Sequence, residues 1–397
     1  MGTGPLEGLL VADFSRVLAG PYATQQLGDL GADVVKVERP GAGDDTRAWG
    51  PPFADERSTY FLAVNRNKRS LVLDLDDERD RRDAVELARR ADVLVENFRP
   101  GGAARFGLDH PSLVRDNPGL VSCSISAFGP GDDQQLPGYD FLVQAMGGLM
   151  SITGPADGPP TKVGVALVDV LTGMNAAIGI LAALRERDRT GRGQHVEVDL
   201  LSSVLAATVN QASGYLNAGV VPSRMGNRHP SITPYESFET ADSPLAVAVG
   251  NDGQFARLCG ALGRPELAED ERFVDNRERV ANRDELAELL GRAFAGHPRD
   301  VWIDRLRRAS VPCGPVNDLA EAIHLAEQVG AEPVVELERA DGTTARSLAG
   351  PITLSATPVT YRRPPPDLDE HGEQLRAWLR DRPSGGDTGP PRADPQA

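Results

Sequence analysis

The stretch TKVGVALVDVLTGMNAAIGILAALRER, residues 161–187, contains a change in hydrophobic period that decides the fold class. Val163 and Val165 alternate with Gly164 and Ala166, which is typical of a strand. From Leu171 onward the apolar residues recur at helical spacing. The stretch therefore predicts a short strand that runs directly into a long helix.

Asp169 stands at the predicted junction between this strand and this helix. The first turn of a helix has backbone N–H groups without intrahelical partners, and the helix dipole favours a negative charge there. One interpretation is that Asp169 caps the helix, a common use of aspartate worth about 1 kcal/mol. The other is that its carboxylate, with small neighbours such as Gly164 and Gly173, stays accessible as a nucleophile. The residues alone leave both interpretations open.

The composition indicates a soluble, acidic protein. The 397 residues are enough for two or three domains, and the 40% hydrophobic content is ample for buried cores. Lys and Arg total 42 against 58 Asp and Glu, and the net charge of -16 opposes non-specific binding to nucleic acid or to an anionic membrane. The N-terminus lacks a signal-peptide pattern, and no run approaches the ~18 apolar residues of a membrane helix. We therefore expect a cytoplasmic protein that binds neither nucleic acid nor membrane.

The N-terminal half alternates predicted strands with predicted helices. The strands are expected at residues 9–14, 33–38, 71–75, 93–95, 120–126 and 194–200. The helices are expected at residues 22–30, 81–90, 139–150 and 203–216, with a short one ending near residue 117. This alternation predicts an α/β domain with a mostly parallel sheet that is covered by helices on both faces.

The C-terminal half has a different character. Gly, Pro, Ser and Arg dominate residues 217–234, which predicts a long connection. A smaller, more helical domain is expected at 235–319, with a strand at 245–249 and helices at 254–262, 283–294 and 300–309. The segment 320–381 is expected to contain a helix at 319–328, short β segments at 334–337 and 352–354, and a helix at 371–379. The tail, residues 382–397, is rich in Pro and Gly and is expected to be disordered.

Basic residues gather at one predicted edge of the parallel sheet. Ligands of such sheets bind beyond the carboxyl ends of the strands, so the turns after the strands are the place to look for chemistry. In and near those turns this acidic chain carries Arg16, Arg39, Arg47, Arg66, Lys68, Arg99 and Arg105. A single exposed cation is often only solvated, but together these residues indicate a site for several phosphates and a carboxylate.

Several other kinds of site are not supported by the sequence. It contains no G-x-G-x-x-G after the first strand, no G-x-x-x-x-G-K-[ST] and no G-x-S-x-G. The six histidines show no metal-ligand spacing. The three cysteines lie far apart without a C-x-x-C pair, which indicates a reducing compartment and no zinc site. A carboxylate nucleophile therefore has few competitors.

Four longer motifs carry a family resemblance: GADVVKVERPGAGDDTR, NRNKRSLVLDL, ADVLVENFRPG and VGVALVDVLTGMNAAIGILAAL. Over nearly its whole length the chain resembles the class III CoA-transferases, the formyl-CoA transferase and carnitine CoA-transferase group that also contains the α-methylacyl-CoA racemases. The segments DDTRAWGPPF, STYFLAVNRNK and SITPYESFET are most similar to the succinate–hydroxymethylglutarate type. The resemblance implies a Rossmann-like large domain, built from residues 1–216 and the returning segment 320–381, and a smaller α+β domain joined to it by long linkers. It also implies two ring-like subunits interlocked as a homodimer.

The resemblance further implies functional residues. Asp169 matches the family's catalytic aspartate. The residues that match CoA-binding positions are Val17, Ala19, Arg39, Lys68, Asn97, Phe98 and Arg105. The candidates for binding the acid substrate are Arg16, Arg47, Arg66 and Tyr139, the last of which stands where racemases have the histidine of a His-Asp pair. The glycine-rich lid of formyl-CoA transferase has no glycine run here, and residues 225–229, MGNRH, are the nearest candidate.

These residues predict an enzyme that moves CoA from an acyl-CoA donor, expected to be succinyl-CoA, to a carboxylic acid, expected to be dicarboxylic. The carboxylate of Asp169 would form an anhydride and then an aspartyl-CoA thioester, with acyl-CoA as substrate and with no metal or ATP. One alternative is a racemase-type isomerase, although the missing histidine removes one of the two bases that α-proton exchange needs. The other is a non-catalytic acyl-CoA-binding protein in which Asp169 only caps its helix.

Overall fold

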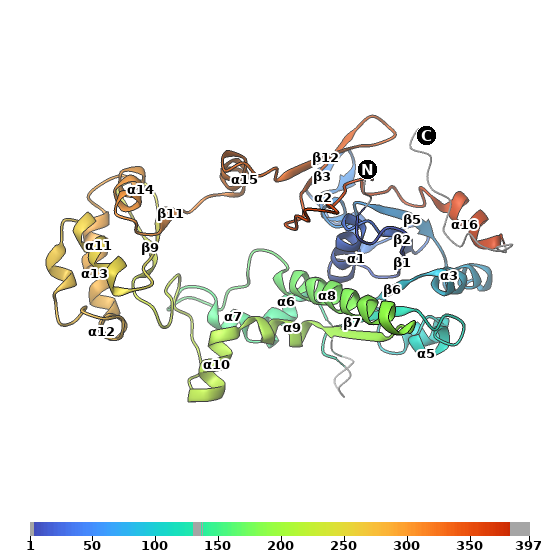
Figure 1. Ribbon diagram of the computed structural model, residues 1–397, viewed down its shortest axis with the longest axis horizontal. Coiled ribbons are helices and arrows are strands. Elements are labelled where there is room, and N and C mark those ends of the chain that lie inside the picture. The colour runs from blue at the N-terminus through green and yellow to red at the C-terminus, as the bar shows by residue number, and fades with distance from the viewer. Residues whose placement is uncertain (1–3, 130–135, 137, 382–397) are drawn as a thin grey trace. The chain divides into compact units, whose positions relative to one another are not determined.

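The computed structural model describes residues 4–129, 136 and 138–381, which form two compact units (Figure 1). Unit 1 contains the described parts of Met1–Gly148, Val163–Ser213 and Glu332–Ala397. Unit 2 contains Leu149–Lys162 and Gly214–Ala331. The predicted disordered tail, residues 382–397, lies outside the described residues.

Unit 1 is built on a parallel six-stranded sheet. Its strands, in chain order, are β1 (Leu10–Asp13), β2 (Asp33–Glu38), β5 (Lys68–Val72), β6 (Val93–Glu96), β7 (Val121–Ser126) and β8 (His195–Asp199). Their order in space is β5-β2-β1-β6-β7-β8, and every neighbouring pair is parallel. The chain moves outward from β1 in one direction and then resumes at β6 on the other side of β1. This reversal is the topological switch point at which doubly wound sheets bind ligands.

Helices cover both faces of this sheet, as the continuous apolar strands require. The longer ones are α1 (Ala19–Asp29), α3 (Glu78–Arg90), α8 (Leu167–Thr190) and α16 (Gly372–Arg380). The shorter ones are α2 (Thr59–Ala63), α4 (Gly102–Phe106), α5 (His110–Leu113), α6 (Asp140–Met146), α9 (Leu200–Ala207) and the 3₁₀ turn η1 (Asp45–Ala48). Helix α1 contacts β1, β2 and β6, and α8 contacts α1, β7 and β8. Helices α3 and α16 pack against each other over a core that includes Phe14, Leu71 and Leu94.

Helices α1 and α8 approach each other closely at a glycine. A Cβ atom added at Gly173 would lie 2.5 Å from the carbonyl oxygen of Ala19 and 3.1 Å from a ring carbon of Tyr22. Only a residue without a side chain therefore fits at this contact. Since Gly173 follows Asp169 by one helical turn, the contact places the start of α1 beside the start of α8.

The C-terminal segment returns to unit 1 and is held there by Asn67, whose φ of 61° is left-handed. The Asn67 side chain donates to the carbonyl of Thr360 at 2.8 Å and accepts from the backbone N–H of Arg362 at 2.7 Å. Helix α16 then inserts Leu375 and Leu379 into the same core as β1 and β5. Two hairpins complete the unit, and their strands are β3 (Phe53–Ala54), β4 (Arg57–Ser58), β12 (Val334–Glu338) and β13 (Thr344–Leu348).

Unit 2 has an antiparallel three-stranded sheet in the order β11-β10-β9. Its strands are β9 (Tyr235–Phe238), β10 (Leu245–Ala248) and β11 (Cys313–Pro315). Its helices are α7 (Leu149–Ile152), α11 (Asp252–Ala261), the 3₁₀ turn η2 (Pro265–Ala268), α12 (Asn276–Ala281), α13 (Arg283–Phe294), α14 (Arg299–Arg308) and α15 (Leu319–Gln328). Helix α10 (Val209–Ala218) runs across the boundary between the two units. The core of unit 2 includes Phe255, Phe273, Phe294 and Trp302, and it is separate from the core of unit 1.

Two predicted strands are wrong. Residues 163–166 contain a bend at 164–165 and no strand, and α8 begins at Leu167. The N–H of Val163 donates to the Gln144 side chain at 2.9 Å, and Val165 is 61% exposed, so the segment neither pairs with the sheet nor packs on the core. Residues 352–354 are also unpaired in the sheets, and the partner of β12 is β13. The sequence of β13, TARSL, buries only small residues and so carries little apolar signal.

Two predicted helices are each divided in two. The segment 139–150 forms α6 and α7, which are separated at Gly147 and Gly148, the latter with φ of 83°. The segment 203–216 forms α9 and α10, which meet near Val209, where φ is 34°. In both cases one residue with positive φ interrupts an apolar pattern that is otherwise continuous.

No uninterrupted run of about 18 apolar residues is expected from the sequence, but α8 is long and apolar enough on average to cross a membrane by length and composition. Its 24 residues include an 18-residue window with a mean hydropathy of 1.8, of which 44% is buried within the structure. A single helix of this kind is weak evidence of a membrane span, because the core helix of a globular domain passes the same test. The contacts of α8 with α1, β7 and β8 are those of a core helix.

We predict that Gly173→Ala destabilises the protein by about 1–3 kcal/mol, because the new methyl group meets backbone atoms of α1 that cannot move independently. The matched control is Gly291→Ala in α13, where no atom lies within 4 Å of the added Cβ. There the usual helical gain of about 0.5–1 kcal/mol is expected. Denaturant unfolding monitored by circular dichroism measures both changes, and equal effects at the two sites would contradict the close contact.

Candidate active site

The turn after β1 lies at the switch point of the sheet and is held from the neighbouring strand. The side-chain amide of Asn97, which follows β6, accepts from the backbone N–H of Arg16 at 3.0 Å and donates to the Arg16 carbonyl at 2.8 Å. The next residue, Val17, has φ of 72°, which is unusual for a β-branched residue. Beyond it α1 begins at Ala19, which contacts α8 at Gly173. The predicted residues Val17, Ala19 and Asn97 are therefore brought together near the start of α8.

The first turn of α8 is capped by Asp140 of α6 and not by Asp169. One carboxylate oxygen of Asp140 accepts from the N–H groups of Val168 and Asp169, at 2.8 and 3.3 Å. Its other oxygen accepts from Gln144 at 2.6 Å. Asp169 is the third residue of α8, so the interpretation that it is the N-cap is wrong. The helix obtains its capping carboxylate from a different element.

The Asp169 carboxylate is left without such a partner. Within residues 4–129, 136 and 138–381, no hydrogen bond or ion pair reaches its side chain. Burial and the nearby charge of Asp140 raise its pKa from 3.8 to about 7. A partly buried carboxylate that is neither paired nor capping is a candidate nucleophile with a stated physical reason.

The charges of these carboxylates also act on Tyr60 of α2, a residue that sequence reasoning missed. Burial, followed by the charges of Asp169, Asp140 and Asp44, raises the pKa of its phenol to about 12. Its ring packs edge-on against Trp49, with 5.1 Å between the ring centroids. Tyr60 therefore stays protonated near Asp169. Tyr60 lies in the segment STYFLAVNRNK, but its residue type and spacing do not single it out, because its position near Asp169 depends on the packing of α2.

The predicted CoA-binding residues fall into two groups. Arg39, Phe98 and Arg105 lie at or near the surface: Arg39 pairs with Asp45, Arg105 pairs with Asp76, and Phe98 packs between Phe14 and Phe106. Lys68 differs, because its side chain is fully buried. Its ammonium donates to Asp13 at 3.0 Å, to the Pro21 carbonyl at 2.9 Å and to Asn65 at 3.0 Å. In this structure Lys68 joins the residues on either side of the turn, Asp13 and Pro21, by hydrogen bonds. Its contact with CoA stays a prediction.

Two of the four candidate residues for the acid substrate already form largely buried ion pairs within the fold. Arg47 forms two 2.7 Å hydrogen bonds to Glu38, and Arg66 forms bonds of 3.0 and 2.6 Å to Asp29. Both guanidinium groups therefore form structural ion pairs within unit 1. Arg16 is half-exposed and lies 3.4 Å from Asp45. Tyr139, just before α6, is 60% exposed.

Two other sequence-based expectations concern the lid and metals. The lid candidate, residues 225–229, belongs to unit 2. Its N–H at Gly226 donates to the Gly154 carbonyl at 3.0 Å, which links two segments of that unit. In the part of the chain that the structure describes, no cluster of three or more His, Cys, Asp or Glu side chains could hold a metal ion.

Comparison with known proteins identifies the family. Residues 6–372 match the model of "CoA-transferase family III". The chain belongs to this family. It is 45% identical over 384 residues to a succinate–glutarate CoA-transferase of Agrobacterium fabrum, covering 94% of this chain and 96% of the relative. It is 43% identical to an acetyl-CoA:oxalate CoA-transferase of Acetobacter aceti, covering 94% and 95% of the two chains.

A solved structure gives the same result. The crystal structure of a CaiB/BaiF family protein from Brucella suis superposes with a TM-score of 0.85 at 43% identity, covering 95% of this chain and all of that one. The family resemblance deduced from the sequence is thus confirmed. The protein is an enzyme, a CoA-transferase, and it moves CoA between acyl-CoA and acids. The alternative of a non-catalytic CoA-binding protein is wrong.

The raised pKa of Asp169 gives a pH-dependent stability. The unfolded carboxyl ionises near pH 4 and the folded one near pH 7, so the folded state binds more protons in between and loses stability as the pH rises from 4 to 7. We predict that Asp169→Asn is as stable as the wild type below pH 4 and more stable by about 2–4 kcal/mol at pH 8. Thermal unfolding of both proteins across this range measures the difference. A difference that does not change with pH would show that the carboxylate is not perturbed.

Proposed function

We propose that this enzyme transfers CoA from succinyl-CoA, or a similar acyl-CoA, to a dicarboxylic acid through covalent intermediates on Asp169. The single observation that carries the proposal is the Asp169 carboxylate, whose capping task is performed by Asp140. Relatives support the substrate class by their names. A succinyl-CoA:glutarate CoA-transferase of Mus musculus is 43% identical over 374 residues, and a succinyl-CoA:mesaconate CoA-transferase of Haloarcula hispanica is 40% identical over 383.

The reaction begins with attack of the Asp169 carboxylate on the thioester carbonyl of the donor. The C–S bond breaks, the thiolate of CoA leaves, and a mixed anhydride joins Asp169 to the acyl group. The thiolate then attacks the Asp169 carbonyl, which releases the donor acid and leaves an aspartyl-CoA thioester. The acceptor carboxylate repeats the two steps in reverse order and leaves as its CoA thioester. Each step exchanges one activated acyl group for another, so the reaction needs no external energy source.

The raised pKa of Asp169 fits this chemistry. A carboxylate with higher proton affinity is a stronger nucleophile, and a pKa of about 7 leaves about half of it ionised at neutral pH. The buried setting that raises the pKa also limits water, which protects the anhydride from hydrolysis. Tyr60, which stays protonated beside Asp169, is placed to donate to a developing oxyanion.

We also propose a homodimer that works in the cytoplasm. Unit 1 leaves apolar side chains exposed on α8 (Met174 at 42% and Ile178 at 62%), on α9 (Leu205 at 51%) and at the start of α10 (Val209 at 70%). Exposed apolar side chains of this kind are typical of protein interfaces when they form a patch. A second copy of the chain, interlocked as the family resemblance implies, would cover them and would help to enclose the reacting groups.

The mechanism predicts transfer of an oxygen atom from the acceptor to Asp169. When the acceptor is activated, one of its carboxylate oxygens stays on the aspartate. We expect that, after one turnover with oxygen-18-labelled glutarate and succinyl-CoA, the peptide containing Asp169 carries one heavy oxygen atom, as measured by mass spectrometry. Omitting succinyl-CoA is the control, because no thioester then forms. Heavy oxygen in released succinate but never in Asp169 would show that the two acids react without the aspartate.

The charge of Asp140 predicts the pH dependence of turnover. The wild-type kcat/KM should rise with pH through an apparent pKa near 7, because Asp169 must be ionised to attack. Asp140→Asn keeps an oxygen that can accept from the N–H groups of α8 but removes the charge, so we expect this limb to move about 1 pH unit lower. Asp169 remains buried in this variant, so the apparent pKa of the limb should stay above 4.

The matched control for that experiment is Glu197→Gln, which removes an exposed carboxylate from β8. It should leave the pH limb in place. If Asp140→Asn and Glu197→Gln give the same limb, then the charge of Asp140 does not act on the group whose ionisation limits the rate.

A further inference from the structure

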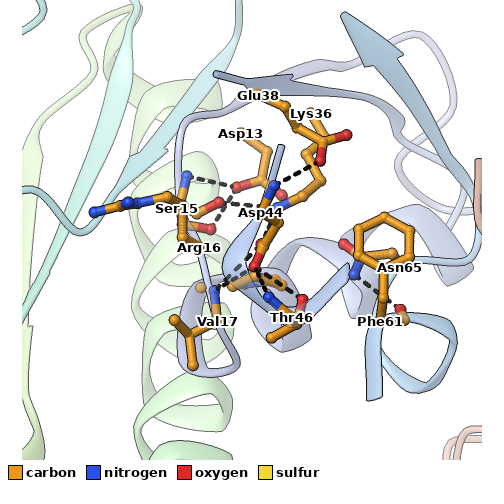
Figure 2. A network of polar contacts seen from close by, with 12 residues as sticks. Asp13, Ser15, Arg16, Val17, Lys36, Glu38, Asp44, Thr46, Phe61 and Asn65 are labelled. Atoms are coloured by element: carbon orange, nitrogen blue, oxygen red, sulfur yellow. Dashed lines mark hydrogen bonds and ion pairs between the residues drawn. The ribbon is translucent and has the colours of Figure 1, made fainter. Parts of the chain in front are cut away.

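The turn Ser15–Val17 is fixed by a buried network of charged side chains (Figure 2). The N–H of Ser15 donates to Asp13 at 3.0 Å, and the Ser15 carbonyl accepts from the ammonium of Lys36 at 3.0 Å. The N–H of Val17 donates to the carboxylate of Asp44 at 3.2 and 3.3 Å. The side-chain amide of Asn97 also bonds the N–H and the carbonyl of Arg16. The backbone of the turn is thus hydrogen-bonded by side chains from β2, from the loop after β2 and from the segment after β6. The shape of the turn therefore does not depend on a bound substrate.

Lys36 and Asp44 form the centre of this network. Their charged atoms lie 2.8 Å apart, and both side chains are completely buried. Asp44 also accepts from the N–H and the hydroxyl of Thr46, at 3.0 and 2.8 Å. Burial alone would raise the pKa of Asp44, but the ammonium of Lys36 and these hydrogen bonds lower this pKa to about 2. The pair thus stays ionised at any pH at which the protein works.

A buried ion pair is a poor way to gain stability, because apolar side chains of the same size often do as well. Its geometric effect is specific, however. Asp44 holds the N–H of Val17, whose left-handed φ of 72° is costly for a β-branched residue and persists only where the surroundings enforce it. Lys36 joins Asp44 to the carbonyl of Ser15, so that both ends of the turn are fixed by one pair.

The turn leads directly to the nucleophile. Helix α1 starts two residues after Val17, and the carbonyl of Ala19 lies against Gly173, one helical turn after Asp169. A change in the turn would therefore move the start of α1 beside the reacting carboxylate.

We propose that the Lys36–Asp44 pair is a positioning device: it holds the Ser15–Val17 turn in the conformation that presents the thioester carbonyl of acyl-CoA to Asp169. This inference rests on the proposed function, since it takes Asp169 as the group that attacks the thioester. Lys36 and Asp44 touch neither substrate nor nucleophile and act through the backbone of the turn. The pair should contribute to kcat and little to CoA affinity.

The test is the double variant Lys36→Met/Asp44→Asn, which removes both charges and leaves no unpaired buried ion. A matched control is Arg69→Met/Asp33→Asn. It removes the ion pair between the fully buried Arg69 of β5 and Asp33, which lies at the amino-terminal end of β2, away from the turn after β1. Melting temperature, binding of free CoA by calorimetry, and steady-state kinetics with succinyl-CoA and glutarate are measured for both.

We expect both double variants to fold and to bind CoA with nearly unchanged affinity. The kcat of Lys36→Met/Asp44→Asn should fall about 10- to 100-fold, because small misplacements of reacting groups have effects of this size. The control should keep its kcat. Equal losses of kcat in the two variants, or a loss that appears only as weaker CoA binding, would overturn the proposal.

Asp169→Asn, measured in parallel, separates this proposal from the one on which it rests. Normal turnover of Asp169→Asn would contradict the proposed mechanism. If Asp169→Asn is inactive and the two double variants have equal kcat values, only the proposed positioning role of Lys36 and Asp44 is contradicted.

Discussion

The candidate active site depends on which carboxylate accepts hydrogen bonds from the N–H groups of the first turn of α8. Helix N-termini attract a negative group, and an aspartate inside the first turn would ordinarily be used for this purpose. Here Asp140, brought in from α6 and oriented by Gln144, accepts the N–H bonds. Two carboxylates thus share a small space, one hydrogen-bonded and one not. Burial, and then the charge of Asp140, raise the proton affinity of Asp169, which is the property that the proposed nucleophile needs.

The sheet topology explains why the other site residues lie where they do. The order β5-β2-β1-β6-β7-β8 places the switch point of the sheet between β1 and β6, and the turn after β1 lies there. Asn97 ties that turn to β6, while Lys36 and Asp44 tie it to β2 and to the loop after it. The Gly173 contact then fixes α1 against α8. A chain of short, buried contacts therefore connects the sheet to the first turns of α8, where the proposed nucleophile Asp169 lies.

Much of the fold could be predicted from periodicity. Strands such as β1 and β2 contain runs of apolar residues because both of their faces are covered, and helices such as α13 have a clear apolar stripe. The strand expected before α8 is absent because the alternating residues 163–166 form a bent segment whose Val163 N–H donates to a side chain and not to a neighbouring strand. The capping task of Asp140 was equally invisible, since it depends on two elements that meet only in three dimensions. The same holds for Tyr60, and for Arg47 and Arg66, whose buried partners no spacing rule reveals.

The return of the C-terminal segment to unit 1 bears on how the chain emerges from the ribosome. Leu375 and Leu379 belong to the core that β1 and β5 begin to form, so this core is incomplete until almost the whole polypeptide has been synthesised. Unit 2 is encoded entirely within that interval, and its own core closes with residues no later than Val311. During translation the inserted unit is thus able to fold first, while the earlier strands still wait for their last helix.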